Sequence, residues 1–229
     1  MKRFKKKYKN LNRYMLDVGI SGFASSVHEG DILLDIGAGS GHYRRFFSTQ
    51  KYVAIDRGIE QGNYKGLDLV GDVKELPLKD GSADAVLCAE VLEHVPSPDF
   101  LMKEINRVLK NGGRLLLTVP LCLGEHMIPF DYHRFTRYAL SGLFEGHGFR
   151  VIRIEPRGGY FTLLAYLLAR IPDQLVRRPG FFLRVFKNLL RWAFTYLLAP
   201  LFVKLDRWDD RKTFTLGFVC EAEKTISVR

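Results

Sequence analysis

Short apolar runs alternate with amphipathic segments along the first two thirds of the chain, and this order is typical of an α/β sheet. The run 32–36 contains one acid and lies between Asp31 and a glycine-rich turn, as expected of a buried parallel strand. Similar runs predict further strands at 52–55, 83–89, 114–120 and 150–155, and a short third strand that ends at 70–72.

Helices are predicted between these strands. The segment 98–109 carries apolar residues at helical spacing, and the Asn-Gly-Gly sequence at 111–113 is expected to end that helix. Shorter helices are predicted at 42–48 and 136–147. A helix within 11–28 is expected to cover the ligand site.

The segment 156–211 interrupts this order with an unusually apolar insertion. Its first run, 160–169, is expected to end as a helix before Pro172, and Pro200 is expected to interrupt its second run, 181–203. The second run is amphipathic, and its recurring charges argue against a membrane span. The five polar positions that share one helical stripe are Arg184, Lys187, Asn188, Arg191 and Thr195.

Such a helix is expected to lie in a membrane interface with its basic stripe towards the lipid headgroups. A helical lid, or a homodimer formed through the insertion, is the competing interpretation because either would bury the same apolar face.

Candidate chemistry begins at the end of the first strand. Gly37, Gly39 and Gly41 alternate there, so the backbone can approach a ligand where a Cβ atom would intrude. A dinucleotide fingerprint needs a further glycine where His42 stands. The Asp35 carboxylate would repel a pyrophosphate and would favour a ligand that carries an ammonium or sulfonium group.

The pattern D-x-G-x-G-x-G resembles motif I of the class I methyltransferases that use S-adenosylmethionine (SAM). The sequences GDVKELP (71–77), DGSADAVLC (80–88) and EVLEHV (90–95) resemble the same family, in its small-molecule, type 11-like branch. The resemblance implies an enzyme with SAM as cofactor. It also implies a Rossmann-like, seven-stranded, mostly parallel sheet whose last strand, within 212–224, is antiparallel.

The strand ends and the resemblance together predict the cofactor site. Asp56 ends the second strand, where an acid accepts hydrogen bonds from both ribose hydroxyls. Asp72 is expected to accept a hydrogen bond from the adenine amino group, with the Val73 amide facing the ring. The complete predicted set is Asp35, Gly37, Ala38, Gly39, Gly41, Asp56, Arg57, Asp72, Val73, Ala89 and Glu90.

The segment 121–140 is expected to carry the acceptor chemistry, because ligands of open parallel sheets bind outside the carboxyl ends of the strands. A hydroxyl acceptor needs a base, and the candidates in order are His133, His126 and Asp131. These residues also suit a labile metal site or a purely structural role, and no metal ligand is assigned. A carboxylate acceptor needs no base, in which case Arg134 and Arg137 become important.

Two further features bear on the acceptor. The motif P-x-D-Y-x-R-F-T (129–136) resembles that of a methyltransferase subgroup associated with bacterial surface-glycan and lipid-linked pathways, which implies hydroxyl or carboxyl acceptors. Glu93 and His94 follow the fourth strand. A histidine beside an acid suits a general base, but in the family that the chain resembles this pair shapes the loop before the next helix.

The net charge of +10 is concentrated in two places. Six of the first ten residues are Lys or Arg, and 156–212 holds 11 basic and 4 acidic residues. An anionic membrane surface is the favoured partner, whereas nucleic acid has only the charge in its support. Three widely spaced cysteines suggest no disulfide framework, so a cytoplasmic protein, peripheral on the inner face of the membrane, is expected.

The sequence predicts three parts: a basic segment and helix (1–30), a SAM-binding domain (31–155 and 212–229) and the helical insertion (156–211). The expected function is methyl transfer from SAM to a hydroxyl or carboxyl of a small, amphipathic or lipid-linked, glycan-type acceptor. The alternative is a non-catalytic, membrane-associated SAM-binding protein of assembly or regulation. The intact acids and glycines of the motifs argue against this alternative.

Overall fold

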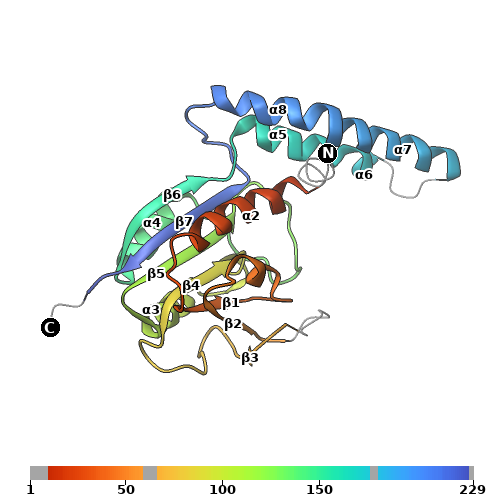
Figure 1. Cartoon of the computed structure of the whole chain (residues 1–229). Coiled ribbons are helices and arrows are strands. Elements are labelled where there is room, and N and C mark those ends of the chain that lie inside the picture. Colours follow the sequence, from red (N-terminus) through yellow and green to blue (C-terminus); the bar gives the residue numbers. More distant parts are fainter. Residues whose placement is uncertain (1–9, 59–65, 176–179, 227–229) are drawn as a thin grey trace. The chain divides into compact units, whose positions relative to one another are not determined.

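The computed structural model describes residues 10–58, 66–175 and 180–226, which form two compact units (Figure 1). The sheet unit comprises Asp17–Glu155 and the chain from Gly217 onward. The helical unit comprises Pro156–Leu216 and the chain up to Leu16. The described part of 1–30 is therefore divided between the two units. The basic run at 1–9 lies outside the described residues.

Seven strands form one sheet in the order β3-β2-β1-β4-β5-β7-β6. Its first five strands pair in parallel, and β7 pairs antiparallel with β5. The predicted fold, a mostly parallel sheet with an antiparallel last strand and a helical insertion before it, is confirmed. The strands are β1 (Ile32–Ile36), β2 (Lys51–Asp56), β3 (Leu69–Val70), β4 (Ala83–Ala89), β5 (Leu109–Pro120), β6 (Phe149–Pro156) and β7 (Gly217–Lys224).

Side chains alternate between the two faces of the sheet, as the pleat of a strand requires. Leu34 and Ile36 of β1 belong to a core cluster that includes apolar residues of α3 (Pro98–Val108) and α4 (Arg137–Gly146). The ring of Phe23, on α2 (Leu11–Ala24), lies edge-on to Phe47, 6.5 Å between centroids. Helical packing therefore holds the parallel strands with their carboxyl ends at one edge.

Two boundary predictions in this unit are wrong. The helix after the glycine turn is a short 3₁₀ helix, η1 (His42–Phe46), and does not reach Ser48. The Asn-Gly-Gly sequence lies inside β5, because Leu109 already pairs with Ala83. Pairing resumes between Ala85 and Arg114, so the intervening residues form a bulge in which Gly112 adopts a positive φ of 76°. Helix ends and strand bulges both use glycine in this conformation.

The helical unit contains two short helices and, beyond residues 176–179, a longer helical path (Figure 1). The helix of the first apolar run ends at Leu168, before Pro172, as expected, and Pro172 itself lies near the start of a separate short helix. In the described part of the chain, no helix is long and apolar enough to cross a membrane. The elements are α5 (Tyr160–Leu168), α6 (Ile171–Leu175), α7 (Phe181–Ala193), η3 (Phe194–Leu198), α8 (Ala199–Leu205) and η4 (Asp206–Trp208).

The expectation that Pro200 interrupts the second apolar run is wrong, because the helix continues through it. Proline lacks the N–H that would complete the preceding turn. The chain widens there into a π-helical turn, η3, in which the Ala199 N–H donates to the Phe194 carbonyl five residues earlier. One continuous helical path therefore runs from α7 to α8.

Acidic side chains fix the start of α5. One carboxylate oxygen of Asp206 accepts hydrogen bonds from the Gly159 amide (2.7 Å) and the Thr162 hydroxyl, and the other accepts from the Thr162 amide (2.9 Å). Asp209 accepts a further hydrogen bond from the Tyr160 amide at 2.7 Å. These carboxylates act as helix caps supplied from far along the chain. Polar contacts as well as apolar packing therefore hold the insertion together.

Candidate functional site

The glycine turn after β1 is attached to the end of β2. The Gly37 and Ala38 amides both donate to the Ile55 carbonyl, at 2.8 and 3.1 Å. The Gly39 amide donates to an Asp56 carboxylate oxygen at 3.0 Å, and the other oxygen of Asp56 accepts from the Gly58 amide at 3.1 Å. The turn therefore has a defined shape that β2 imposes.

Each of the three alternating glycines has a positive φ, of 71°, 54° and 69°. A Cβ atom on Gly37 would lie 2.4 Å from a methyl carbon of Val91, so the protein itself excludes a side chain there. A Cβ atom on Gly39 would meet no protein atom within 4 Å. Of the three alternating glycines, Gly39 is therefore the one with no protein atom beside it, and its approach to a ligand stays a prediction.

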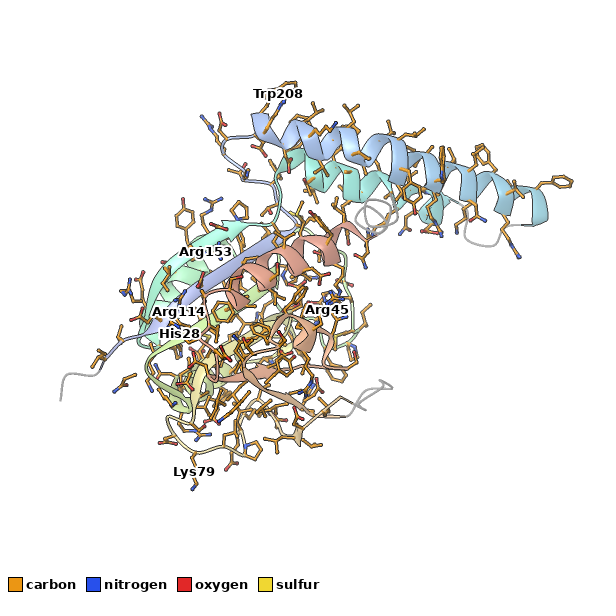
Figure 2. All side chains as sticks on the ribbon, viewed as in Figure 1. His28, Arg45, Lys79, Arg114, Arg153 and Trp208 are labelled. Atoms are coloured by element: carbon orange, nitrogen blue, oxygen red, sulfur yellow. The ribbon has the colours of Figure 1, made fainter. Side chains whose placement is uncertain are left out.

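The helix α2 reaches the same region through one carboxylate. Asp17 pairs with Arg45 of η1 at 2.7 Å, and its second oxygen lies 3.5 Å from Nε2 of His42. Arg45 is labelled in Figure 2. The predicted helix over the ligand site thus contacts the short helix that follows the glycine turn.

The remaining predicted cofactor residues lie at other strand ends. Arg57 and Asp72 are exposed, and Oδ1 of Asp72 accepts a hydrogen bond from the Lys74 amide at 2.9 Å. Val73 packs against the core cluster. Ala89 ends β4, and Glu90 follows it with a positive φ of 57° while its amide donates to the Thr118 carbonyl at 3.0 Å. Their contacts with a cofactor stay predictions.

Asp35 is almost completely buried, with 1% of its surface exposed, and its carboxyl group accepts a hydrogen bond from the Tyr52 hydroxyl. Burial, partly offset by that hydrogen bond, raises the pKa of Asp35 to about 7, and the negative charge of Asp56 adds to the increase. Asp35 is therefore partly protonated near neutral pH. Its attraction for a cationic ligand stays a prediction, and Tyr52 is a partner that sequence reasoning missed.

The acceptor segment is attached to the residues that follow β4. The amides of Tyr132 and His133 both donate to the Glu93 carbonyl, at 2.9 and 3.3 Å. Nδ1 of His94 lies 2.7 Å from the Phe130 carbonyl. Glu93 and His94 belong to the 3₁₀ helix η2 (Leu92–His94), so these two residues position the segment that sequence reasoning assigned to the acceptor.

The structure brings together His126 and Asp131, two of the three candidate bases. Nδ1 of His126 lies 3.4 Å from Oδ2 of Asp131, and its Nε2 lies 3.8 Å from Oε1 of Glu93. The Glu93 and Asp131 carboxylates raise the pKa of His126 despite its partial burial. Sequence reasoning placed Glu93 beside the strand end but did not connect it with His126.

The other two candidate bases have different surroundings. Asp131 accepts two hydrogen bonds from the Arg134 guanidinium, at 2.6 and 2.7 Å, which hold the pKa of Asp131 well below its usual range. Nε2 of His133 lies 3.3 Å from the Pro96 carbonyl. His133 does not cap α4, because the Thr136 side chain accepts from the Ala139 amide there.

Comparison with known proteins matches one segment of the chain to a known family. A family model described as a methyltransferase domain matches residues 34–117, the segment that contains the glycine turn and the ends of β2 and β4. For this segment, the match confirms the predicted resemblance to the class I SAM-dependent methyltransferases. It supports the predicted enzyme class and SAM as the cofactor.

Among relatives, the chain is 33% identical to an uncharacterized methyltransferase from Mycobacterium leprae, over 45% of this chain and 41% of the relative. It is 33% identical to a fatty-acid O-methyltransferase from Mycolicibacterium smegmatis, over 47% and 44%. It is 28% identical to a ubiquinone/menaquinone biosynthesis C-methyltransferase from a Caulobacter strain, over 63% of both chains. The chain thus spans less than two thirds of these relatives.

Solved structures show the same fold. A SAM-dependent methyltransferase from Aquifex aeolicus is 23% identical with a TM-score of 0.53, over 66% of this chain and 92% of that one. A phosphoethanolamine N-methyltransferase from Haemonchus contortus, bound to S-adenosylhomocysteine, is 18% identical with a TM-score of 0.58, over 92% and 53%.

Substituting Gly39 with alanine should weaken SAM binding by at least about 10-fold, because the new methyl group would occupy space that the protein leaves open to the ligand. Stability should fall by only about 1 to 2 kcal/mol, the cost of a positive φ for a residue with a Cβ atom. Calorimetric titration with SAM and urea unfolding measure the two effects.

The control is Gly30→Ala, since Gly30 also has a positive φ (82°) and open space around it but lies outside the predicted site. This variant should lose similar stability and keep wild-type affinity. Equal SAM affinity in the two variants would show that the backbone at Gly39 does not approach the ligand.

A second prediction concerns Asp35 and pH. Its folded-state pKa of about 7 lies above its ordinary value of 3.8, so between these values the folded chain holds a proton that the unfolded chain releases. The stability that Asp35 contributes is therefore present at low pH and is lost as the pH rises towards 7, by at most about 1.4 kcal/mol per pH unit. Asp35→Asn should become more stable relative to wild type as the pH rises from 5 to 8 in urea unfolding.

Asparagine keeps the acceptor for the Tyr52 hydroxyl and removes only the charge, so the difference between the two curves isolates the titration. Asp210→Asn, at an exposed acid of the helical unit, should give a curve parallel to that of wild type over this range. A parallel curve for Asp35→Asn would contradict the prediction.

Proposed function

We propose that this methyltransferase transfers the SAM methyl group to a hydroxyl or carboxyl oxygen of an amphipathic or lipid-linked, glycan-type acceptor at an anionic membrane surface. When bound, SAM supplies an electrophilic methyl carbon. The chain must then hold the acceptor oxygen in line with that carbon, about 3 to 3.5 Å away. The proposed location is cytoplasmic, on the inner face of the membrane.

The exposed apolar side of α7 and α8 is the observation that carries this proposal. Long apolar side chains there are about half exposed or more, although they lie on regular helices. Soluble proteins rarely leave such a contiguous set in water, and it is typical of a membrane or protein interface. The residues are Phe182, Leu183, Val185, Phe186, Leu189, Trp192, Leu197 and Leu201, and they are called the apolar face below.

The polar stripe of the same helix is used inside the unit. Lys187 pairs with Asp173 of α6 at 2.9 Å, and Arg191 pairs with the same carboxylate. Asn188 and Thr195 line one depression together with Asp173. The stripe therefore meets α6 as well as solvent, and its orientation towards lipid headgroups stays a prediction. The apolar face remains as the side available to lipid.

The charge of the insertion and one relative also support an anionic membrane surface and a lipid acceptor. The segment 156–212 has an excess of seven basic residues (11 minus 4), which favours anionic lipid. In the sheet unit, exposed apolar side chains occur in the acceptor segment at Met127, Ile128, Phe130 and Tyr132. One relative is named for O-methylation of a fatty acid, which is a lipid with a carboxyl group.

For a hydroxyl acceptor, we infer that His133 is the base. The Pro96 carbonyl accepts from Nε2–H of His133, which leaves Nδ1 as the proton acceptor. The ion pair of Asp131 with Arg134 makes that carboxylate a poor base, and the raised pKa of His126 favours its protonated form. A carboxylate acceptor would need none of these groups.

A labelled methyl group from SAM should enter the organic phase when the purified chain is incubated with membrane extract of its source organism. The chain should also co-sediment with vesicles that contain anionic phospholipid. Replacing Phe186 and Leu189 together with serine should lower both vesicle binding and transfer by at least about 100-fold, because each side chain loses about 2 kcal/mol of apolar burial and the two losses sum to about 4 kcal/mol.

A matched control replaces Val18, an exposed apolar residue of the sheet unit, with serine, and should change neither result. Label in the aqueous phase alone would reject the lipid-linked acceptor and leave the apolar face as a lid or dimer surface. SAM binding without any transfer would support the non-catalytic alternative.

His133→Asn should lower kcat by about 100-fold with a hydroxyl acceptor, the usual contribution of a general base, while SAM affinity stays unchanged. The measurement is steady-state transfer with the acceptor found above. The control is His28→Ala, which replaces an exposed histidine far from His133 in the sequence and should keep full activity (Figure 2). Full activity of His133→Asn would exclude His133 as base and would favour a carboxylate acceptor.

A further inference from the structure

We propose that Glu93, His94 and His126 form a binding site for a divalent transition-metal cation. Each residue offers one ligand atom, and these atoms all lie within 4.8 Å of one another. Glu93 and His94 come from η2 after β4, whereas His126 comes from the segment after β5. The fold therefore brings together residues that are more than thirty positions apart.

The two imidazoles converge on one carboxylate oxygen. Nε2 of His94 lies 3.7 Å from Oε1 of Glu93, and Nε2 of His126 lies 3.8 Å from the same atom. The two rings meet edge-on, with centroids 4.7 Å apart. Ligands of a tetrahedral ion are about 3.4 Å apart, because each lies about 2.1 Å from the metal. Small side-chain movements would complete this geometry.

The Glu93 carboxylate is the strongest evidence that the cluster holds a cation. The Glu93 side chain has no exposed surface, and neither of its oxygens accepts a hydrogen bond from any group that the structure describes. Nε2 of His94 is likewise buried without a hydrogen-bond partner in the described chain. An ionised carboxylate in such surroundings is costly unless a positive charge compensates it. A bound divalent cation would satisfy all three atoms at once.

In each histidine the nitrogen that would not bind the metal, Nδ1, already faces a hydrogen-bond acceptor, as is usual for histidine ligands of a metal. Nδ1 of His94 faces the Phe130 carbonyl at 2.7 Å, so it carries the proton and leaves the Nε2 lone pair directed inward. Nδ1 of His126 faces the Gly124 carbonyl at 3.3 Å and Asp131 at 3.4 Å. Arg134 in turn holds Asp131. A carbonyl or carboxylate behind the ligating histidine is the usual outer shell of a metal site.

Two imidazoles and one carboxylate favour zinc, manganese, iron or cobalt over magnesium or calcium, which prefer oxygen ligands alone. Three protein ligands leave at least one coordination position for water or for an acceptor oxygen. Both contributing segments follow the carboxyl ends of strands. A hydroxyl acceptor at that position would lose its proton more readily, and this use of the ion rests on the proposed function.

Metal binding can be measured without SAM or an acceptor. The chain, without a histidine tag, is stripped with a chelator, dialysed against micromolar Zn²⁺ and analysed for metal by mass spectrometry. One Zn²⁺ per chain is expected for wild type and for the control His28→Ala. Titration with Co²⁺ should produce the visible absorption bands of a nitrogen- and oxygen-ligated ion.

His126→Ala and Glu93→Gln should each weaken Zn²⁺ binding by at least about 10-fold and abolish the Co²⁺ bands, since loss of one of three ligands removes much of the affinity. Retained SAM binding shows that a variant is folded. Should Glu93→Gln fail this check, His126→Ala decides, because the His126 side chain is about one-third exposed (36%) and its loss leaves no buried cavity.

Absence of Zn²⁺ from the dialysed wild type, or equal binding by His126→Ala, overturns the proposal. The cluster would then be an ion pair between protonated His126 and Glu93. Zn²⁺ binding by a chain that transfers no methyl group would leave this site standing while the proposed function fails.

Discussion

The attachment of the glycine turn to the end of β2 is the constraint on which the site depends. The Ile55 carbonyl accepts two amides of the turn, and the Asp56 carboxylate accepts the amide of Gly39. Of these three bonds, the one to the Asp56 carboxylate is charge-assisted, and hydrogen bonds to charged groups contribute about 1.5 to 3 kcal/mol, more than neutral ones. Because Val91 excludes a side chain at Gly37, residues after β4 fix the turn from its other side. The parallel register of β2, β1 and β4 thus sets the shape of the turn.

Glu93 has a comparable role for the segment after β5, and it uses both its backbone and its side chain. Its carbonyl accepts the amides of Tyr132 and His133, while its carboxylate lies between His94 and His126. A loop without secondary structure would otherwise place its histidines variably. Since the backbone of η2 fixes the loop and the buried carboxylate faces two imidazoles, one residue links the ends of β4 and β5.

Much of the fold follows from local pattern, and the failures have physical causes. The strand 83–89 was predictable to the residue because it is a buried, mostly apolar run that begins two residues after Gly81. The Asn-Gly-Gly sequence was misread because a helix end and a strand bulge both need a positive φ. Pro200 was misread because a π turn can absorb the missing N–H.

Contacts between distant segments were beyond such reasoning. Spacing placed Lys187 and Arg191 on one side of a helix, but it could not show that Asp173 of α6 would face them. For the same reason, the Tyr52 partner of Asp35 and the Glu93 partner of His126 had no local signal. In ordinary amphipathic helices the apolar side is buried and the polar side is in water. In α7 the polar side is partly satisfied by α6 and the apolar side is exposed, the reverse of that ordinary arrangement. Such a face is typical of a surface that lipid or another protein covers, which is why the proposed function is argued from it.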